Sequence, residues 1–232
     1  MRLELGRAPE DSALKIGVLA AQGDFAAHAG MLASLGAEPI EVRVPKQLAD
    51  LDGLVIPGGE STTIMKAIDR DGLEPAIRAH VESGRPLFGT CAGLIVTDRD
   101  HLGLLDASTK RNAYGRQLQS FECDLEVAGL GAEPLHAVFI RAPTIQEHGD
   151  QVEVLATHDG RPVVVRDGQI LGCAFHPELT DDSRLHALFM AMATGARASD
   201  STGDLSSNGD GSLSSPSAGR RDGSALASHG DS

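Results

Sequence analysis

A cysteine stands between two glycines, directly after a short apolar run, in the stretch PLFGTCAGLI (residues 86–95). This spacing is the cysteine version of a nucleophile elbow, a sharp strand-to-helix turn that lifts a reactive side chain clear of a sheet. Glycines suit a turn that is too tight for a Cβ atom. The helix that follows would favour a thiolate at Cys91, and the amide of Ala92 would point at a developing oxyanion. The pattern predicts a nucleophile; a buried cysteine in an ordinary turn is the alternative.

A histidine and a glutamate two positions apart follow the last apolar run, in Phe175-His176-Pro177-Glu178. In an extended chain, residues i and i+2 project to the same side, and a proline keeps the residue before it extended. A carboxylate beside an imidazole fixes its tautomer and stabilises the imidazolium, as in a nucleophile–base–acid triad. His176 and Glu178 are therefore the candidate base and orienting acid. The alternative is a capping turn before the last helix, with His176 at the surface.

The segment PGGESTT (residues 57–63) is a glycine turn between an apolar run and a helical pattern. Its amides could complete an oxyanion hole opposite the amide of Ala92. The alternative is an ordinary strand-to-helix turn with Ser61 or Thr62 as the N-cap. A nucleotide P-loop is excluded because the Gly-Lys-Ser/Thr ending is missing.

Two arginines, Arg111 and Arg141, are candidates for binding a small carboxylate. The guanidinium fork matches the geometry of that group. Taken singly, each arginine is better explained by a surface ion pair.

The elements that must position these residues alternate between strand and helix in the first half of the chain. Short apolar runs predict strands over residues 15–20, 38–44, 51–56 and 86–89. Apolar residues at helical spacing predict helices over residues 24–36, 61–69 and 73–83, the first with Asp24 as N-cap and Gly36 as its stop. This alternation is typical of right-handed βαβ units and a mostly parallel sheet.

Strand patterns dominate the second half, over residues 117–127, 135–140, 152–157, 162–166 and 169–175. The last two predict a hairpin around Asp167-Gly168. A final helix is expected to open at Thr180 and to stop at Gly195, with its apolar face on Leu185, Leu188, Phe189 and Met192.

These elements place one folded domain at residues 15–196. Residues 1–14 are expected to form a flexible leader. Ser, Gly and Asp dominate residues 197–232, which contain no aromatic residue. Such a stretch cannot bury enough apolar surface to offset chain entropy, so we expect a disordered tail.

Composition excludes several classes of protein. A formal charge of −13 leaves no basic patch to neutralise phosphates, which argues against a nucleic-acid partner. The chain has three cysteines, Cys91, Cys123 and Cys173, and no two of them form a Cys-x-x-Cys motif. Neither a disulfide framework nor a zinc site is therefore expected. No secretory signal or bilayer-length apolar run is visible. We therefore expect a cytoplasmic protein without a membrane partner.

Six stretches together resemble class I glutamine amidotransferases: IGVLAAQGDFAAH, LVIPGGESTTI, PLFGTCAGLI, HLGLLDASTKRNAYGRQLQSFE, VFIRAP and LGCAFHPELTDDSRLHALF. They cover about residues 15–192 and are most similar to the family of glutaminase subunits of pyridoxal 5'-phosphate synthase. The combination of GGESTT, GTCAGL, FIRAP and FHPEL is specific for that family. The resemblance implies a three-layer α/β fold, with a mostly parallel central sheet flanked by helices and with extra antiparallel strands.

The resemblance also implies roles for individual residues. Cys91 would be the nucleophile, His176 the base and Glu178 its orienting acid, and the amides of Gly59 and Ala92 would hold the oxyanion. Glutamine would be bound at the matching positions Gly59, Glu60, Ser61, Arg111, Ile140 and Arg141.

The implied reaction is hydrolysis of L-glutamine to L-glutamate and ammonia through a thioester. In this family the ammonia passes to a separate synthase subunit, a (β/α)8 barrel that builds pyridoxal 5'-phosphate from a pentose phosphate and a triose phosphate. The glutaminase chain itself would hold no cofactor and no metal. Family behaviour further implies that docking on the synthase completes the oxyanion hole and switches on activity.

The chain departs from the family pattern in one place near the elbow. Only residues 96–100 separate Ile95 from His101, where relatives carry a longer helix and loop. We therefore expect a truncated helix behind Cys91. The leader and the tail also exceed the usual family frame.

Three alternatives share parts of this pattern. Another amidotransferase or a γ-glutamyl hydrolase would have the same fold and triad, but GGESTT and FIRAP count against it. A PfpI-like protein would place an acid before the elbow and would lack the His-Pro-Glu ending. A non-catalytic subunit that only docks on the synthase would explain the short segment after Cys91. Selective reaction of Cys91 with a glutamine-analogue electrophile would separate this last alternative from an enzyme.

Overall fold

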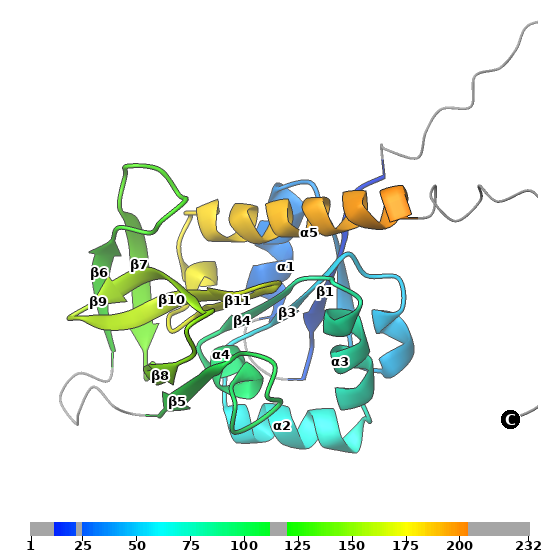
Figure 1. Ribbon diagram of the computed structural model, residues 1–232, viewed down its shortest axis with the longest axis horizontal. Helices are drawn as coiled ribbons and strands as arrows, with labels where there is room; N and C mark the ends of the chain where they lie inside the picture. The colour runs from blue at the N-terminus through cyan, green and yellow to red at the C-terminus, as the bar shows by residue number, and fades with distance from the viewer. Residues whose placement is uncertain (1–11, 22–24, 112–119, 204–232) are drawn as a thin grey trace, which may run out of the picture.

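The largest sheet consists of five mutually parallel strands, with two further strands added in antiparallel pairing at one edge (Figure 1). The computed structural model of the chain describes residues 12–21, 25–111 and 120–203. The strand order is β2 (Glu38–Val42), β1 (Lys15–Leu19), β3 (Gly53–Ile56), β4 (Leu87–Thr90), β11 (Ile170–Cys173), β10 (Arg161–Asp167) and β9 (Glu153–His158). Every residue of β3, β4 and β11 is buried, as expected for strands covered on both faces.

Helices cover both faces of this sheet (Figure 1). The first group is α1 (Phe25–Ser34) and α5 (Arg184–Gly203), and the group on the opposite face is α2 (Ser61–Arg70), α3 (Glu74–Glu82) and the short α4 (Ala92–Thr97). Two 3-10 turns, η1 (Pro45–Leu48) and η2 (Pro177–Leu179), connect other elements. The predicted fold class, a mostly parallel sheet flanked by helices with extra antiparallel strands, is confirmed.

Two small antiparallel sheets complete the fold. One pairs β6 (Ser120–Leu125) with β7 (Leu135–Ile140), and the other pairs β5 (Ala107–Lys110) with β8 (Thr144–His148). The sequence analysis missed β5 and β8. Both are short, and their pairing contains a register shift between Ser108 and Thr109, so neither carries a regular alternation that would mark a strand. The predicted hairpin is present, since Asp167 pairs with Ile170 in the antiparallel β10–β11 ladder.

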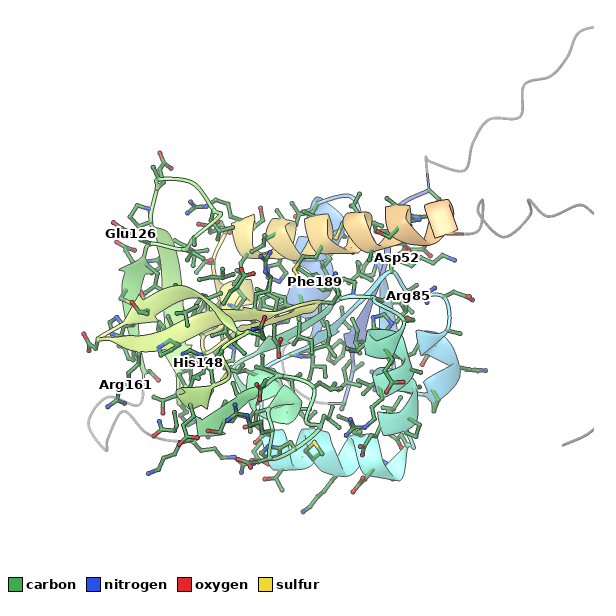
Figure 2. The ribbon with its side chains drawn as sticks, in the orientation of Figure 1. Asp52, Arg85, Glu126, His148, Arg161 and Phe189 are labelled. Carbon is green, nitrogen blue, oxygen red and sulfur yellow. The ribbon has the colours of Figure 1, made fainter. Side chains whose placement is uncertain are left out.

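The core beneath α5 is built from aromatic side chains. Phe189 points from α5 toward the sheet (Figure 2), where its ring centroid lies 5.7 Å from that of Phe88 on β4. Both side chains are fully buried. This contact fixes the last helix over the middle of the sheet, close to the strand that leads to Cys91.

The predicted ends of the last helix are wrong at both sides. The helix begins at Arg184 because Thr180 and Asp182 form a turn before it, in which Asp182 Oδ1 accepts a hydrogen bond from the Arg184 amide at 3.0 Å. At the other side the helix passes through Gly195 to Gly203. Gly195 has no positive φ and no atom within 4 Å of an added Cβ, so nothing at this position ends the helix.

Contacts of Arg197 connect the end of the described part of the chain to its beginning. The Arg197 guanidinium donates to Ser12 O at 3.0 Å and to Ser12 Oγ at 2.5 Å, and it lies 3.7 Å from Asp52 Oδ2. Ordered contacts therefore extend slightly beyond residues 15–196. Most of the expected leader and tail, residues 1–11 and 204–232, lies outside the described residues. No helix in the described part of the chain is long and apolar enough to cross a membrane.

Candidate active site

The candidate residues meet where three parallel strands end. Because β3, β4 and β11 run in the same direction, their carboxyl ends share one edge of the sheet, which is where α/β folds place ligand sites. Cys91 follows β4, and its amide donates to Cys173 O on β11 at 2.9 Å. The segment after β3 begins at Pro57, and His176 follows β11.

The elbow has the strand–turn–helix geometry that its sequence predicts. Cys91 adopts φ 48° and ψ −104°, a strained conformation for a residue with a side chain. A Cβ on Gly89 would lie 2.8 Å from Gly93 O, and a Cβ on Gly93 would overlap Ile56 O. Both glycines are needed because the backbone of α4 packs directly on β4 and β3.

The short helix behind the elbow, α4, is well packed. All six residues of α4 are buried. Directly after it, the fully buried Asp98 carboxylate accepts hydrogen bonds from His101 Nδ1 at 2.7 Å and from Thr109 Oγ1 at 2.5 Å, and it also accepts from the amides of Asp100 and Thr109. These four bonds close the short connection to β5.

His176 and Glu178 form a hydrogen-bonded pair next to Cys91. His176 Nδ1 lies 2.8 Å from Glu178 Oε1, and the side chains are 14% and 1% exposed. Burial lowers the pKa of His176, but hydrogen bonds and charge from Cys91 and Glu178 outweigh it and raise the pKa to about 10. Burial raises the pKa of Glu178, but hydrogen bonds from His176 and His28 outweigh it and hold the pKa well below its usual value. The geometry is that of a base oriented by a carboxylate.

A cavity of about 280 Å³ opens in front of this pair. It is lined by all the residues proposed from the sequence except Glu178, together with Ile95: Gly59, Glu60, Ser61, Cys91, Ala92, Ile95, Arg111, Ile140, Arg141 and His176. Glu178 lies behind His176. The fold therefore brings together segments that are up to about a hundred positions apart in the sequence.

Glu60 and Arg111 make one wall of the cavity. Glu60 is the N-cap of α2, because its carboxylate accepts from the Thr63 amide at 3.0 Å; the caps considered from the sequence, Ser61 and Thr62, are not used. Burial raises the pKa of Glu60, but hydrogen bonds from Thr63 and Thr62 together outweigh it and lower the pKa. Arg111 Nη1 donates to Thr62 Oγ1 at 3.0 Å and lies 3.7 Å from Glu60 Oε1.

The end of β7 forms another wall. The carbonyl oxygen of Ile140 lies 3.8 Å from Cys91 Sγ, and the side chain of Ile140 is exposed. Arg141 has φ 47°, an uncommon conformation for a residue with a side chain. Strain at such a position is found chiefly where surrounding structure holds a functional group in place.

The sequence analysis missed several residues that contact the site. A Cβ on Gly58 would overlap His176 Cε1 and lie 3.3 Å from Cys91 Cβ. The glycine therefore allows the loop after β3 to approach His176 and Cys91 closely. His28 and His186, both fully buried, lie behind Glu178. His28 precedes Leu32 by one helical turn, so its place on the buried stripe of α1 was the one signal available.

The other two cysteines lie in strands. Cys173, on β11, is fully buried; burial raises the pKa of its thiol well above the usual value, and its Sγ contacts Phe175 O at 3.4 Å. Cys123 lies on β6, and burial also raises its pKa. Within residues 12–21, 25–111 and 120–203, no three His, Cys, Asp or Glu side chains are grouped as metal ligands.

Comparisons with known proteins agree on the kind of protein to which this chain is similar. Residues 18–194 match the model of the SNO glutamine amidotransferase family. The chain is 50% identical over 191 residues to pyridoxal 5'-phosphate synthase subunit PdxT of Geobacillus kaustophilus, an alignment that covers 79% of this chain and 97% of the relative. It is 53% identical over 188 residues to the protein of the same name from Halorubrum lacusprofundi, covering 75% and 95% of the two chains.

Solved structures lead to the same fold. A crystal structure of a glutamine amidotransferase superposes with a TM-score of 0.74 at 49% identity, covering 77% of this chain and 98% of that one. A glutamine amidotransferase from Thermotoga maritima shares the fold with a TM-score of 0.55 at 15% identity, covering 84% and 86%. From the match over most of its folded part and the identity to its relatives, the chain belongs to the SNO glutamine amidotransferase family.

Proposed function

We propose that the chain is the glutaminase subunit of pyridoxal 5'-phosphate synthase and hydrolyses L-glutamine to L-glutamate and ammonia. One observation carries the proposal: a single cavity is lined by Cys91 and His176 and by every residue that the family resemblance assigns to glutamine binding. Membership of the glutamine amidotransferase family and relatives named as synthase subunits support the same activity.

The chemistry proceeds by nucleophilic catalysis. Cys91 attacks the side-chain carbonyl carbon of glutamine as a thiolate, and the amides of Gly59 and Ala92 hold the oxyanion. As the first residue of α4, Ala92 has an amide with no partner inside the helix, which leaves it available for this role. His176, with its Nδ1 held by Glu178, donates a proton to the departing ammonia. It then takes a proton from the water that cleaves the thioester and releases glutamate.

The walls of the cavity match the charged groups of the substrate. Arg111 and Arg141 supply guanidinium groups for the α-carboxylate, and Glu60 supplies a carboxylate for the α-ammonium group. Ser61 and Ile140 complete the glutamine-binding positions. The Arg111–Glu60 and Arg111–Thr62 contacts hold two of these groups in place before substrate arrives.

Ammonia is passed to a synthase subunit in this proposal, because the relatives are named as subunits of a synthase rather than as free hydrolases. Docking on that subunit completes the oxyanion hole. Gly59, with φ 132°, has a backbone conformation that only glycine adopts readily, so its peptide can reorient without a side-chain penalty. The chain uses no cofactor or metal of its own and works in the cytoplasm, where Cys91 stays a free thiol.

The test is glutamate release from L-glutamine by the purified chain, with and without the synthase subunit. Cys91→Ala is the inactivating variant, and Cys123→Ala is its matched control because Cys123 lies on β6 and does not line the cavity. Turnover is expected to depend on Cys91, to survive Cys123→Ala and to rise when synthase is added. If wild type and Cys91→Ala release equally little glutamate in the presence of synthase, the chain is a docking subunit without chemistry.

A further inference from the structure

A pair of buried histidines lies directly behind the acid of the proposed triad. His28, on α1, and His186, on α5, both have no exposed surface, although nothing in the proposed reaction requires them. Isolated imidazoles are costly to bury unless their nitrogens find partners. The partners that His28 finds lead to the active site.

Distances join the histidine pair to Glu178. His28 Nε2 lies 3.2 Å from Glu178 Oε2 and 3.2 Å from Thr90 Oγ1, with good hydrogen-bond geometry to the hydroxyl. His28 Nδ1 lies 2.9 Å from His186 Nε2. Since Glu178 Oε1 is already bonded to His176, the two oxygens of one buried carboxylate face two different imidazoles. By hydrogen-bond geometry, Oε2 has no partner among the described residues, so its 3.2 Å contact with His28 Nε2 is an ion-pair distance and not a formed hydrogen bond.

These contacts select one arrangement of protons. His28 Nε2 faces two oxygens that can accept a hydrogen bond, Glu178 Oε2 and Thr90 Oγ1, so we assign the proton of His28 to Nε2. Burial lowers the pKa of His186 to about 3, so His186 is neutral. Its Nδ1 has no hydrogen-bond partner among the described residues, and an unpartnered lone pair there costs less than an unpartnered N–H. His186 therefore donates from Nε2 to His28 Nδ1.

We propose that His28 is a positioning residue that holds the Glu178 carboxylate in the plane that His176 requires, and that His186 fixes the tautomer of His28. The proposal rests on the glutaminase chemistry proposed above. A line of groups then runs from α5 through α1 to the proposed nucleophile: His186, His28, Glu178, His176 and Cys91.

The groups that face this line are few. His176 and His28 face Glu178, His186 faces His28, and the thiols of Cys91 and Cys173 lie within electrostatic reach. Phe88 covers His186 from the sheet, with 5.6 Å between the ring centroids. Removing the His28 imidazole would take away the nitrogen that lies 3.2 Å from the buried Glu178 Oε2. The carboxylate would then hold a proton to higher pH and would orient His176 less well.

The experiment compares His28→Ala and His28→Gln in the full chain with its synthase partner. A glutamine can bring an amide N–H close to the place of the imidazole Nε2, so it restores the donor without the ring. His80→Ala is the matched control, because His80 is also a buried histidine but lies on α3, on the face of the sheet opposite α1 and α5, where it bonds Pro86 O. Two profiles are measured against pH: kcat and KM for glutamine, and the rate of Cys91 alkylation by iodoacetamide, followed by mass spectrometry.

His28→Ala is expected to lower kcat about tenfold to a hundredfold, a part of the usual contribution of general acid–base catalysis, with KM nearly unchanged. The acid limb of both profiles should move to higher pH. His28→Gln should recover most of kcat and return the acid limb toward its wild-type place, whereas His80→Ala should move neither profile. A His28→Ala chain that only loses thermal stability, with wild-type profiles, overturns the proposal, and so does a His28→Gln chain as impaired as His28→Ala.

The proton arrangement has its own readout. Imidazole 15N NMR of the wild-type chain should identify His28 as the Nε2–H tautomer, and His186→Leu should let the other tautomer appear. A wild-type His28 protonated only at Nδ1 would contradict the proposal. These two readouts separate the hypotheses: absence of glutamine hydrolysis by wild type would refute the proposed function, while the alkylation profiles and the NMR tautomer still decide the role of His28.

Discussion

Cys91 and His176, the proposed nucleophile and base, are held in place by different means. Cys91 is held by its backbone, whose positive φ costs on the order of 1–3 kcal/mol and persists because β4, β11 and α4 are packed around it. His176 is held by its side chain, through the bond from Nδ1 to Glu178. The position of the proposed nucleophile is therefore set by backbone packing, whereas the position of the proposed base depends on one buried carboxylate and its surroundings.

The paired charges of His176 and Glu178 predict a specific dependence of stability on pH. Glu178 has a lowered pKa, so its contribution is present above its usual value of 4.5 and is lost as pH falls below it. His176 has a raised pKa, so its contribution is complete below its usual value of 6.5 and is lost as pH rises through about 10. In urea unfolding, the free energy of unfolding of wild type should exceed that of Glu178→Gln, and the difference should be largest between pH 4.5 and 6.5.

The control for that comparison is Glu38→Gln, at the exposed start of β2. Its difference from wild type should be small and should not peak in the same window. A difference between wild type and Glu178→Gln that stays constant from pH 3 to 10 would show that the pair does not titrate as the structure requires.

The close packing at Gly58 predicts that a side chain at this position would displace His176, the proposed base. In Gly58→Ala, the added methyl group would overlap His176 Cε1 and lie 3.0 Å from Nδ1, so the imidazole must move from its place beside Glu178. We expect kcat to fall at least about tenfold, since general acid–base catalysis contributes about 10²–10⁴ and depends on this geometry. Glutamate release gives kcat, and Gly30→Ala is the control because its methyl group enters open space on α1. Unchanged kcat in Gly58→Ala would refute the close approach.

At the scale of elements, the short α4 and the long α5 support the site from opposite faces of the sheet. The α4 helix needs no long continuation, because the buried Asp98 carboxylate closes the chain immediately after it. The α5 helix carries His186 and Phe189 over β4. Its continuation past Gly195 lengthens the element, and Arg197 then reaches Ser12 and Asp52.

The course of α5 can be tested at Gly195. If this glycine lies inside the helix, Gly195→Ala should raise the free energy of unfolding by up to about 1 kcal/mol, because alanine has the higher helix propensity. Gly84, which follows the end of α3 with φ +82°, is the matched opposite case: Gly84→Ala should lower stability by about 1–2 kcal/mol. Urea unfolding gives both values. A loss of stability in Gly195→Ala would place a helix end there.

At the scale of the whole molecule, local patterns in the sequence account for the sheet and for the order of its elements. The apolar runs of β3, β4 and β11 and the glycines of the elbow are local features, so the edge where Cys91 and His176 meet could be placed in advance. The histidine pair could not, because His28 and His186 are 158 positions apart and no local pattern reports that contact. The same limit applies to β5 and β8, whose pairing is decided by distant chain and not by their own residues.

The end of α5 was misjudged for a different reason. Glycine near the end of an apolar stripe commonly stops a helix, but it does so by adopting a positive φ, and Gly195 does not. Only the packing of α5 on the sheet and the contacts of Arg197 beyond it explain why the helix continues. The helix therefore continues into residues 197–203, which were expected to belong to the tail.

The place of β11 in the sheet has a consequence for synthesis of the chain on the ribosome. β11 lies between β4 and β10 in the middle of the sheet, yet it begins 80 positions after β4 ends. At usual translation rates, the open edge of β4 waits about 4–16 s for its partner. An unpaired strand edge of this kind invites pairing with other chains. The newly made protein therefore passes through a period of vulnerability to aggregation, which ends only when the strand that precedes His176 has emerged.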